Sequence, residues 1–206
     1  FSTKENKQIL IKKAKAKNEI NISRLAEKNA KQALKQKLIQ SDTNNNLIDA
    51  LTKKFKLNNN LELIEVYDNS HIQGSDAIGA LICFGNEGFE KKRYRKFNIK
   101  NEEIKGDDYG MMKEVLFRRF SKAVKEKAGS LSLPDLILID GGKGQYSVSR
   151  EVLNELGLHD LPILAVAKGK KRNAGEEKIY HEGKEYILKK NDPLLFFIQR
   201  LRDEAH

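Results

Sequence analysis

Apolar residues fall into short strand-like runs over most of the chain after residue 60. Some runs are continuous, which is typical of strands buried on both faces, and others alternate with polar residues, which is typical of one buried face. Turn residues separate the runs, and the Gly-Asn-Glu-Gly stretch at 85–88 predicts a hairpin. The strands predicted in this way are residues 61–68, 77–85, 89–100, 135–140 and 162–169, and a small hairpin is predicted over 178–190.

Between these strands the apolar spacing changes to the three-and-four rhythm of amphipathic helices. One such helix is predicted over residues 106–127, with Asp107 as its N-cap. A second follows the fourth strand up to about Leu156, and a third covers residues 192–206, where Pro193 lies in the first turn.

The first 60 residues have a different pattern. Residues 7–15 predict a short edge strand, and residues 22–39 have the apolar spacing of a helix. Residues 41–60 carry two asparagine clusters around a short apolar patch, which predicts a linker with one or two helical turns inside it. We therefore expect a strand and helix extension with an Asn-rich linker over residues 1–60 and one domain over residues 61–206.

The order of elements in the domain predicts its fold class. Three strands in antiparallel succession are followed by helix, strand, helix and strand, then a hairpin and a closing helix. This order favours an α/β fold of the ribonuclease-H-like type, a mixed sheet flanked by helices in which the first and fourth strands are parallel neighbours. A doubly wound Rossmann sheet fits less well, because it would alternate strand and helix from the start.

The positive charge of the chain is concentrated in the N-terminal extension. The whole chain carries a formal net charge of +10, of which residues 1–60 contribute +9 and the remainder only +1. A basic arm points to an anionic partner such as nucleic acid, although a solvated lysine-rich helix would look the same. Cys83 is the only cysteine, so internal disulfides are excluded and a reducing, cytoplasmic setting is expected. No apolar run approaches the ~18 residues of a membrane span.

Two aspartates occupy strand ends that the fold would bring together. Asp68 ends the first predicted strand and Asp140 ends the fourth, where it is followed by the Gly-Gly-Lys-Gly loop of residues 141–144. Two carboxylates at one edge of a sheet repel each other unless a cation lies between them, and Mg²⁺ or Mn²⁺ prefers oxygen ligands. The glycines would leave room for a substrate backbone. The alternative for Asp140 is an ordinary turn aspartate.

Further residues reach the same edge by topology. Asp108 opens the helix after the third strand, and His206 ends the closing helix. Two acids with a histidine suit metal-assisted attack of water on a phosphodiester. Asp108 is equally suited to capping its helix, and His206 could be a solvated terminal residue. His71 is interpreted as structural.

Lysines near this edge are candidates for phosphate contacts. The loop that contains Lys143 lacks the spacing of a nucleotide phosphate loop, which argues against a nucleoside triphosphatase. Lys143 and Lys168 remain candidates for contacts with nucleic-acid phosphates, with solvated loop lysines as the alternative.

Several ordered blocks resemble one known family. They are IEVYDNSHIQGSDAIGA, YRKFNIK, GDDYGMMKEVLFRRF, PDLILIDGGKGQ, VAKG and FFIQRLRDEAH. Together they closely resemble the C-terminal endonuclease half of UvrC, a subunit of the bacterial nucleotide-excision-repair nuclease, from about Leu61 to His206. Residues 20–40 resemble the helix that precedes this domain in the family.

The resemblance implies a ribonuclease-H-like endonuclease, dependent on Mg²⁺ or Mn²⁺, that cuts damaged DNA on the 5′ side of the lesion. It implies Asp68, Asp140 and His206 as the catalytic and metal-binding triad and Asp108 as an accessory acid. Segments that the family uses for the 3′ cut, for docking UvrB and for further DNA binding have no counterpart in this sequence, so we expect a monomeric piece of a longer protein. The alternative is a catalytically silent module that binds DNA or a partner in the same complex.

Overall fold

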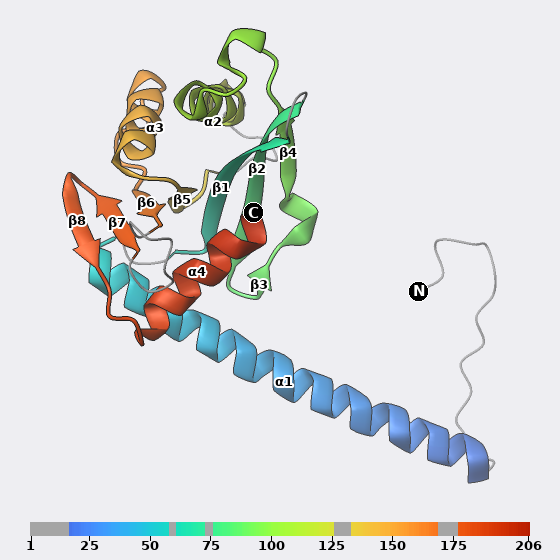
Figure 1. The fold of residues 1–206 in the computed structure, drawn as a ribbon. Helices are drawn as coiled ribbons and strands as arrows, with labels where there is room; N and C mark the ends of the chain where they lie inside the picture. Colours follow the sequence, from blue (N-terminus) through green and yellow to red (C-terminus); the bar gives the residue numbers. More distant parts are fainter. Residues whose placement is uncertain (1–16, 58–60, 73–75, 126–132, 169–176) are drawn as a thin grey trace. The chain divides into compact units, whose positions relative to one another are not determined.

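The computed structural model describes residues 17–57, 61–72, 76–125, 133–168 and 177–206 (Figure 1). By its internal contacts the chain divides into two compact units, Phe1–Asp42 and Thr43–His206. Helix α1, Lys17–Phe55, begins in the first unit and ends in the second. The second unit carries every strand that the structure describes, and it contains all of the predicted site residues.

The second unit is built on one mixed sheet. Its strands follow the order β3-β2-β1-β5-β6-β7-β8, and β4 also pairs with β2. The strands are β1 Leu63–Ile72, β2 Asp76–Gly85, β3 Gly88–Phe89, β4 Arg95–Asn98, β5 Leu136–Asp140, β6 Ile163–Ala167, β7 Lys178–His181 and β8 Lys184–Ile187. The pairs β1–β5 and β5–β6 are parallel, and the other pairs are antiparallel.

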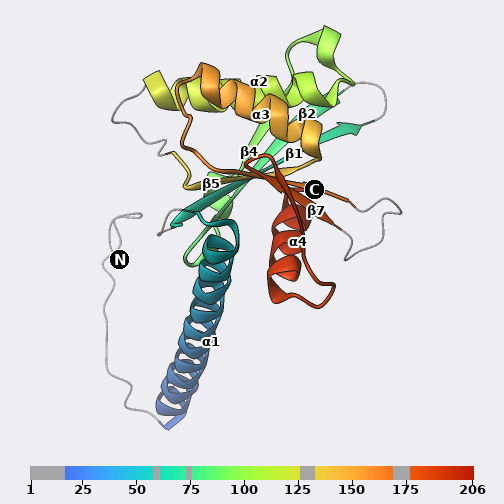
Figure 2. The same cartoon turned by 90° about the vertical axis from the view of Figure 1, so that its left-hand side faces the viewer.

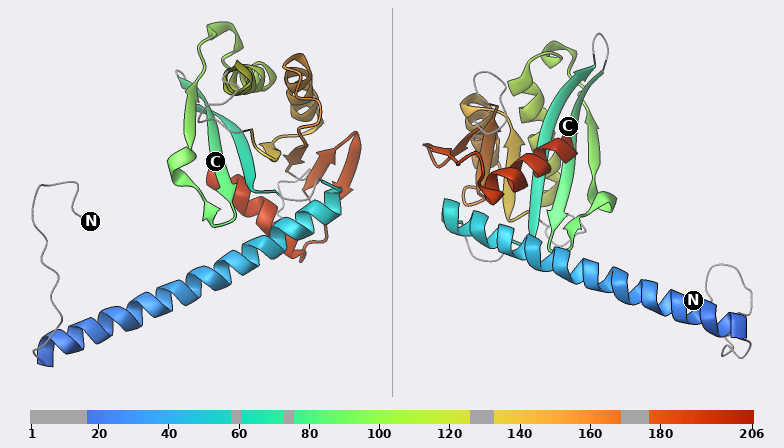
Figure 3. Two further views of the ribbon diagram at one scale, coloured as in Figure 1. Left: turned by 180° about the vertical axis from the view of Figure 1, so that it is seen from behind. Right: turned by 60° about the horizontal axis from the view of Figure 1, so that its bottom comes forward.

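Helices cover both faces of the sheet (Figure 2). Helices α2, Asp108–Lys125, and α3, Lys143–Glu155, pack on one face, where Tyr67 and Ile139 belong to the buried cluster. Helix α4, Pro193–Ala205, packs on the other face and crosses β1 and β2 (Figure 3). Two short 3₁₀ turns, Lys91–Arg93 and Glu102–Ile104, complete the secondary structure. Within the part of the chain that the structure describes, no helix is long and apolar enough to cross a membrane.

The predicted topology is confirmed. The first and fourth predicted strands, now β1 and β5, are parallel neighbours, with Ile64 opposite Leu136 and Tyr67 opposite Ile139. The predicted hairpin at 85–88 joins β2 to β3. A mixed sheet with helices on both faces, in which β1, β2 and β4 are antiparallel and β5 and β6 continue parallel to β1, is the arrangement that the order of elements predicted.

The predicted linker over residues 41–60 is wrong for most of its length, because helix α1 continues through it to Phe55. The last turns place Ile48, Leu51 and Phe55 three and four residues apart, and all three are buried in the core cluster on the α4 face. This burial stabilises a helix whose asparagines are poor helix formers, since tertiary packing routinely outweighs intrinsic propensity. The compact unit accordingly includes residues on the N-terminal side of Leu61.

Two strand predictions differ in detail. The strand predicted over residues 89–100 is interrupted by the 3₁₀ turn at Lys91–Arg93, so that β3 and β4 are separate short strands. Three consecutive basic side chains cannot alternate into a core, which leaves this segment exposed on the edge of the sheet. β1 continues beyond Asp68 to Ile72, because its second half pairs with β2 alone. The edge strand predicted at residues 7–15 lies outside the described residues.

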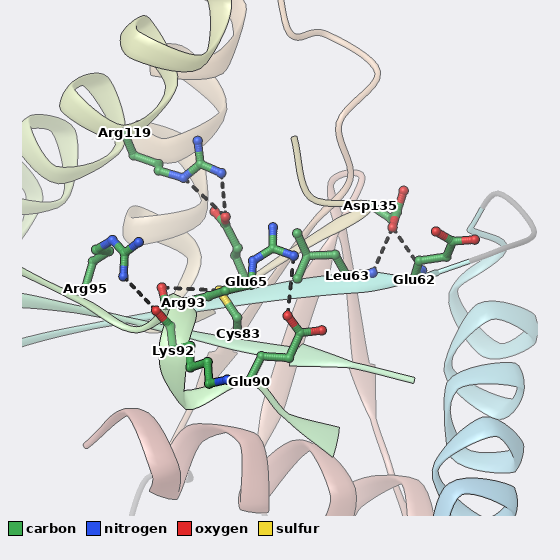
Figure 4. Close-up of polar contacts among 10 residues, drawn as sticks. All are labelled: Glu62, Leu63, Glu65, Cys83, Glu90, Lys92, Arg93, Arg95, Arg119 and Asp135. Carbon is green, nitrogen blue, oxygen red and sulfur yellow. Dashed lines mark hydrogen bonds and ion pairs between the residues drawn. The ribbon is translucent and has the colours of Figure 1, made fainter. Parts of the chain in front are cut away.

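A buried ion pair links β1 to α2 (Figure 4). Glu65 Oε1 accepts hydrogen bonds from Arg119 Nε at 3.2 Å and Nη2 at 2.6 Å, and Glu65 Oε2 accepts one from the Tyr67 hydroxyl at 2.5 Å. Burial, followed by the charge of Glu65, raises the pKa of Tyr67 well above its ordinary value. Both Glu65 and Arg119 are almost fully buried, so the charges are matched where water cannot screen them.

Truncation of the α1 end tests its place in the core. Leu51 is fully buried, so Leu51→Ala is expected to lower the free energy of unfolding by about 2–5 kcal/mol in urea denaturation. Lys54→Ala, on the exposed side of the same turn, is the control and is expected to change stability by less than about 0.5 kcal/mol. Equal stability of the two variants would contradict the integration of α1 into the domain.

The single cysteine gives a second test of the core. Burial, and then the charge of Glu65, raises the pKa of Cys83 to about 12. At pH 8 only about one thiol in 10,000 is then a thiolate, which is the reactive form. We expect Cys83 to resist a thiol reagent in the folded chain and to react fully in denaturant. Reaction of the folded chain at the rate of a free thiol would show that the strand is not packed as described.

Candidate active site

Strand register brings Asp68 and Asp140 to the same level. The parallel pairing of β1 with β5 runs up to Tyr67 opposite Ile139, and the next residues along each strand are Asp68 and Asp140. Successive side chains of a strand point to opposite faces. Because Tyr67 and Ile139 face α2 and α3, the two aspartates face α4. Their side chains are only 9% and 11% exposed.

Helix α4 brings two cationic or ionisable side chains to these carboxylates. His206 Nδ1 lies 3.0 Å from Asp68 Oδ2, and Arg202 Nε donates to Asp140 Oδ1 at 3.0 Å. Residues four apart lie on the same helix face, so one helix serves both aspartates. Asp192 caps the start of the helix by accepting a hydrogen bond from Leu194 N through its side chain, and Pro193 lies in the first turn. Its buried residues anchor it to the sheet: Leu194, Leu195, Phe197, Ile198, Leu201, Arg202 and Ala205.

The Asp68 contact sets the tautomer of His206. An ionised carboxylate can only accept, so Nδ1 of the ring carries a hydrogen and donates it to Asp68. Nε2 is then left to accept a proton or a ligand. The side chain is 68% exposed, which makes Nε2 accessible from solvent. A carboxylate that orients an exposed imidazole is a common arrangement for acid–base chemistry.

The structure places Asp108 at the start of α2, where its backbone carbonyl contacts residues next to the two site strands. The Asp108 carbonyl accepts from Asn69 Nδ2 at 3.4 Å and from Gln145 Nε2 at 3.0 Å. Asn69 follows Asp68, and Gln145 follows the loop after Asp140, so the start of α2 is anchored between the two site strands. Asp107 accepts from Tyr109 N at 3.0 Å, which confirms it as the N-cap of the helix.

Comparison with known protein families identifies the family of this chain. Residues 52–206 match the family model described as the UvrC RNase H endonuclease domain. The chain belongs to the UvrC RNase H endonuclease domain family. This membership confirms the predicted ribonuclease-H-like fold class. The match begins inside the last turn of α1, in agreement with the packing of that turn into the core.

Curated relatives of the chain support the same family assignment. The chain is 53% identical over 187 residues to UvrABC system protein C of Hyphomonas neptunium, covering 88% of this chain and 30% of that protein. It is 43% identical over 210 residues to the protein of the same name in Caulobacter vibrioides, covering 100% of this chain and 33% of that protein. The chain thus spans about a third of the length of these relatives. Among solved structures, human endonuclease V gives a TM-score of 0.38 at 18% identity, over 68% of this chain and 54% of that one, a likeness too weak to bear on either fold or function.

Arg202 is the site residue of this UvrC endonuclease domain that sequence reasoning missed. It is buried and is paired with Asp140, 62 positions earlier in the chain. Its signal in the sequence is an arginine on the apolar face of the closing helix, one turn before the histidine. A charged residue on a buried face requires a partner, and the nearby strand ends offered carboxylates.

The two lysines predicted to contact phosphates lie at this edge of the UvrC domain in different settings. Lys168 Nζ is 3.8 Å from Asp140 Oδ2 and its side chain is 53% exposed. Lys143 is exposed at the start of α3. Contact of either lysine with nucleic acid stays a prediction.

The glycines after Asp140 serve packing more than substrate access, in contrast to the sequence interpretation. A Cβ at Gly141 would lie 2.4 Å from the Gln145 side chain, and one at Gly144 would lie 2.4 Å from the Tyr109 hydroxyl. Gly142 alone has space, with Ala167 Cβ at 3.7 Å. The approach of Tyr109 from α2 explains Gly144, and the Gln145 side chain in the first turn of α3 explains Gly141.

The donor set suits a hard divalent cation in its chemistry. Among the described residues, Asp68 Oδ1 has no hydrogen-bond partner, and Asp140 Oδ2 has only Lys168 at 3.8 Å. Each carboxylate thus keeps one oxygen available. The described residues hold no group of three or more His, Cys, Asp or Glu side chains gathered closely enough to form a complete metal site. The predicted sharing of one ion by Asp68 and Asp140 stays a prediction, and Asp140 is instead paired with Arg202 and Lys168.

Removal of Arg202 tests the pairing. Arg202→Leu leaves Asp140 in a buried position with its nearest cation gone, and is expected to lower the free energy of unfolding by about 2–4 kcal/mol. In an Asp140→Asn background the same change should cost at least about 1 kcal/mol less, because no charge is left unpaired. Strictly additive losses in this double-mutant cycle, measured in urea, would contradict the contact.

Proposed function

We propose that this chain hydrolyses a phosphodiester bond of damaged DNA, making the incision on the 5′ side of the lesion in nucleotide excision repair. Membership of the UvrC RNase H endonuclease domain family supports a nuclease. The observation that carries the proposal is the pairing of Asp68 with His206 at the level of Asp140. It combines buried carboxylates with an oriented, exposed imidazole at one edge of the sheet.

Dependence on Mg²⁺ or Mn²⁺ is part of the proposal. Asp68 and Asp140 would hold the ion, and His206 would either complete its ligand set or carry a proton, since the free ring nitrogen can serve only one of these roles at a time. When bound, a divalent ion polarises the phosphoryl group and lowers the pKa of a bound water. The carboxylates otherwise repel a phosphodiester, so the charge of such an ion also suits an anionic substrate.

The side chains of the domain have separate roles in this proposal. Asp68 fixes the ring of His206, and Nε2 of His206, when it is not bound to the ion, can take up or deliver a proton at a reacting oxygen. Arg202 holds Asp140 in place by one oxygen. Asp108 acts as an accessory acid at the start of α2. Lys143, at the start of α3, and Lys168, just after β6, contact DNA phosphates.

Partners and setting follow from the same proposal. The relatives are named as part of a UvrABC system. We propose that the longer protein works with UvrB through segments outside this chain, in the cytoplasm, and that the chain itself is monomeric. A catalytically silent DNA- or partner-binding module is the second candidate, and the pairing of Asp140 with Arg202 and Lys168 favours it.

Substitution of the two carboxylates separates these candidates. In the full-length protein within the reconstituted repair complex, Asp68→Asn and Asp140→Asn are expected to lower the rate of 5′ incision at least about 100-fold, while loading on lesion DNA persists in a gel shift. Asp160→Asn changes an exposed aspartate between α3 and β6 and should cut at the wild-type rate. Wild-type incision by Asp68→Asn or Asp140→Asn would refute the endonuclease proposal and favour the silent module.

Metal binding is tested on the 206-residue chain without any reaction. Titration with Mn²⁺ by calorimetry should give binding in the wild-type chain and in Asp160→Asn, and a loss of that binding in Asp68→Asn and Asp140→Asn. Equal Mn²⁺ binding by all four proteins would place the ion elsewhere.

A further inference from the structure

A run of basic residues follows the edge of the sheet beside β1 and β2. Residues 90–96 read Glu-Lys-Lys-Arg-Tyr-Arg-Lys and contain five basic residues and one acid. Lys92, Arg95 and Lys96, here called the edge cations, are exposed. Arg95 donates only to the backbone carbonyls of Lys92 at 3.1 Å and Tyr94 at 2.8 Å, and among the described residues none of the three has a carboxylate partner.

The acids in this area are already engaged by other groups. Glu90 is 3.4 Å from Arg93 Nη1. Glu204 accepts from the Tyr94 hydroxyl at 2.9 Å and lies 3.9 Å from Lys91 Nζ. Elsewhere in the domain partly exposed lysines do have acidic partners, such as Lys113 with Glu151 at 2.8 Å. The positive charge of the edge cations is therefore uncompensated and available to an anionic partner.

Strand register ties Lys96 to the active site, whereas Arg95, the preceding residue of β4, is opposite Leu81 and projects from the other face. Asp68 of β1 is opposite Ala80 of β2, and Ala80 is opposite Lys96 of β4. Directly opposed residues of an antiparallel pair point to the same face, so Lys96 projects from the face that carries Asp68. Neighbouring strands are about 4.8 Å apart, which puts the Lys96 backbone about 10 Å from that of Asp68. This distance is on the order of the rise of three nucleotides along a DNA strand.

The sheet face next to this row is accessible. The following row across β1, β2 and β4 is Ser70, Ile78 and Asn98, of which Ser70 and Asn98 are exposed and Ile78 is half-buried. Helix α4 ends at Ala205, so its cover stops at the Asp68 level. The Tyr94–Glu204 hydrogen bond joins the basic run to the last turn of α4, two residues before His206. The edge cations and the site thus share one rigid support.

We propose that the edge cations bind the phosphate backbone of a DNA strand that crosses the β4 edge of the sheet, where both faces present a cation, and then passes over the Asp68 face to His206. The inference rests on the proposed function, because it takes DNA as the anionic partner. Contacts to phosphates carry no sequence information, which suits a nuclease that has to act on DNA of any sequence. The edge cations extend the contact surface to the β4 side, opposite Lys143 and Lys168, which lie beyond β5 and β6.

The test compares two triple variants of the chain that lose the same charge. Lys92→Gln/Arg95→Gln/Lys96→Gln removes the edge cations. The control, Lys125→Gln/Lys184→Gln/Lys189→Gln, removes three exposed lysines of α2, of β8 and of the segment after β8. Binding to a fluorescein-labelled duplex is measured by anisotropy in EDTA between about 50 and 200 mM salt. The edge variant is expected to bind at least about tenfold more weakly than the control variant, with a log–log salt slope smaller by about 2–3.

Three outcomes overturn the inference. One is binding by the edge variant within about threefold of the control variant. Another is weaker binding with an unchanged salt slope, which would exclude phosphate contacts. The third is self-association of the edge variant in sedimentation with DNA affinity retained, which would assign these residues to blocking edge-to-edge strand pairing. Because EDTA prevents metal-dependent cleavage, this measurement is independent of the incision test: a cutting Asp68→Asn protein would refute the proposed function and leave the binding result standing.

Discussion

The parallel pairing of β1 with β5 is the constraint on which the rest of the site depends. A slip of one residue would turn Asp68 or Asp140 to the opposite face, because side chains alternate along a strand. The register is held at both ends. At one end Asp135 Oδ2 accepts from Glu62 N at 2.9 Å and Leu63 N at 2.8 Å, while Asp135 N donates to Leu63 O (Figure 4). At the other end Tyr67 and Ile139 are locked into the core under α2 and α3.

Helix α4 supplies the side chains that pair with the two aspartates. Two nearly buried carboxylates at one level of a sheet destabilise the fold unless each has a partner. Arg202 and His206 supply these partners from one helix face, and the apolar residues of the same face fix the helix on the sheet. Stability and function are therefore coupled here. Arg202 and His206, which offset the cost of burying the two carboxylates, are also the side chains closest to the proposed chemistry.

Local patterns predicted the strands, the N-cap at Asp107 and the adjacency of β1 and β5, because each depends on spacing within a short window or on the order of elements. The helical end of α1 was not predictable from its asparagines, since Leu51 and Phe55 are helical through contacts with a core built from residues far along the chain. Arg202 was missed for the same reason: its partner Asp140 is distant in sequence. The interruption of β3 and β4 at Lys91–Arg93 likewise depends on an edge position that only the sheet order reveals.

The pairing of Asp140 with Arg202 is compatible with the binding of a divalent ion. Arg202 contacts Asp140 through Nε alone, on Oδ1, whereas a bidentate fork would engage both oxygens. Oδ2 has only Lys168, at 3.8 Å and half exposed, which an ion can displace at little cost. The same division holds at Asp68, where His206 occupies Oδ2 and leaves Oδ1. In each carboxylate one oxygen is tied to α4 and the other remains for a ligand, so the protein contacts orient the acids without using up their capacity to bind.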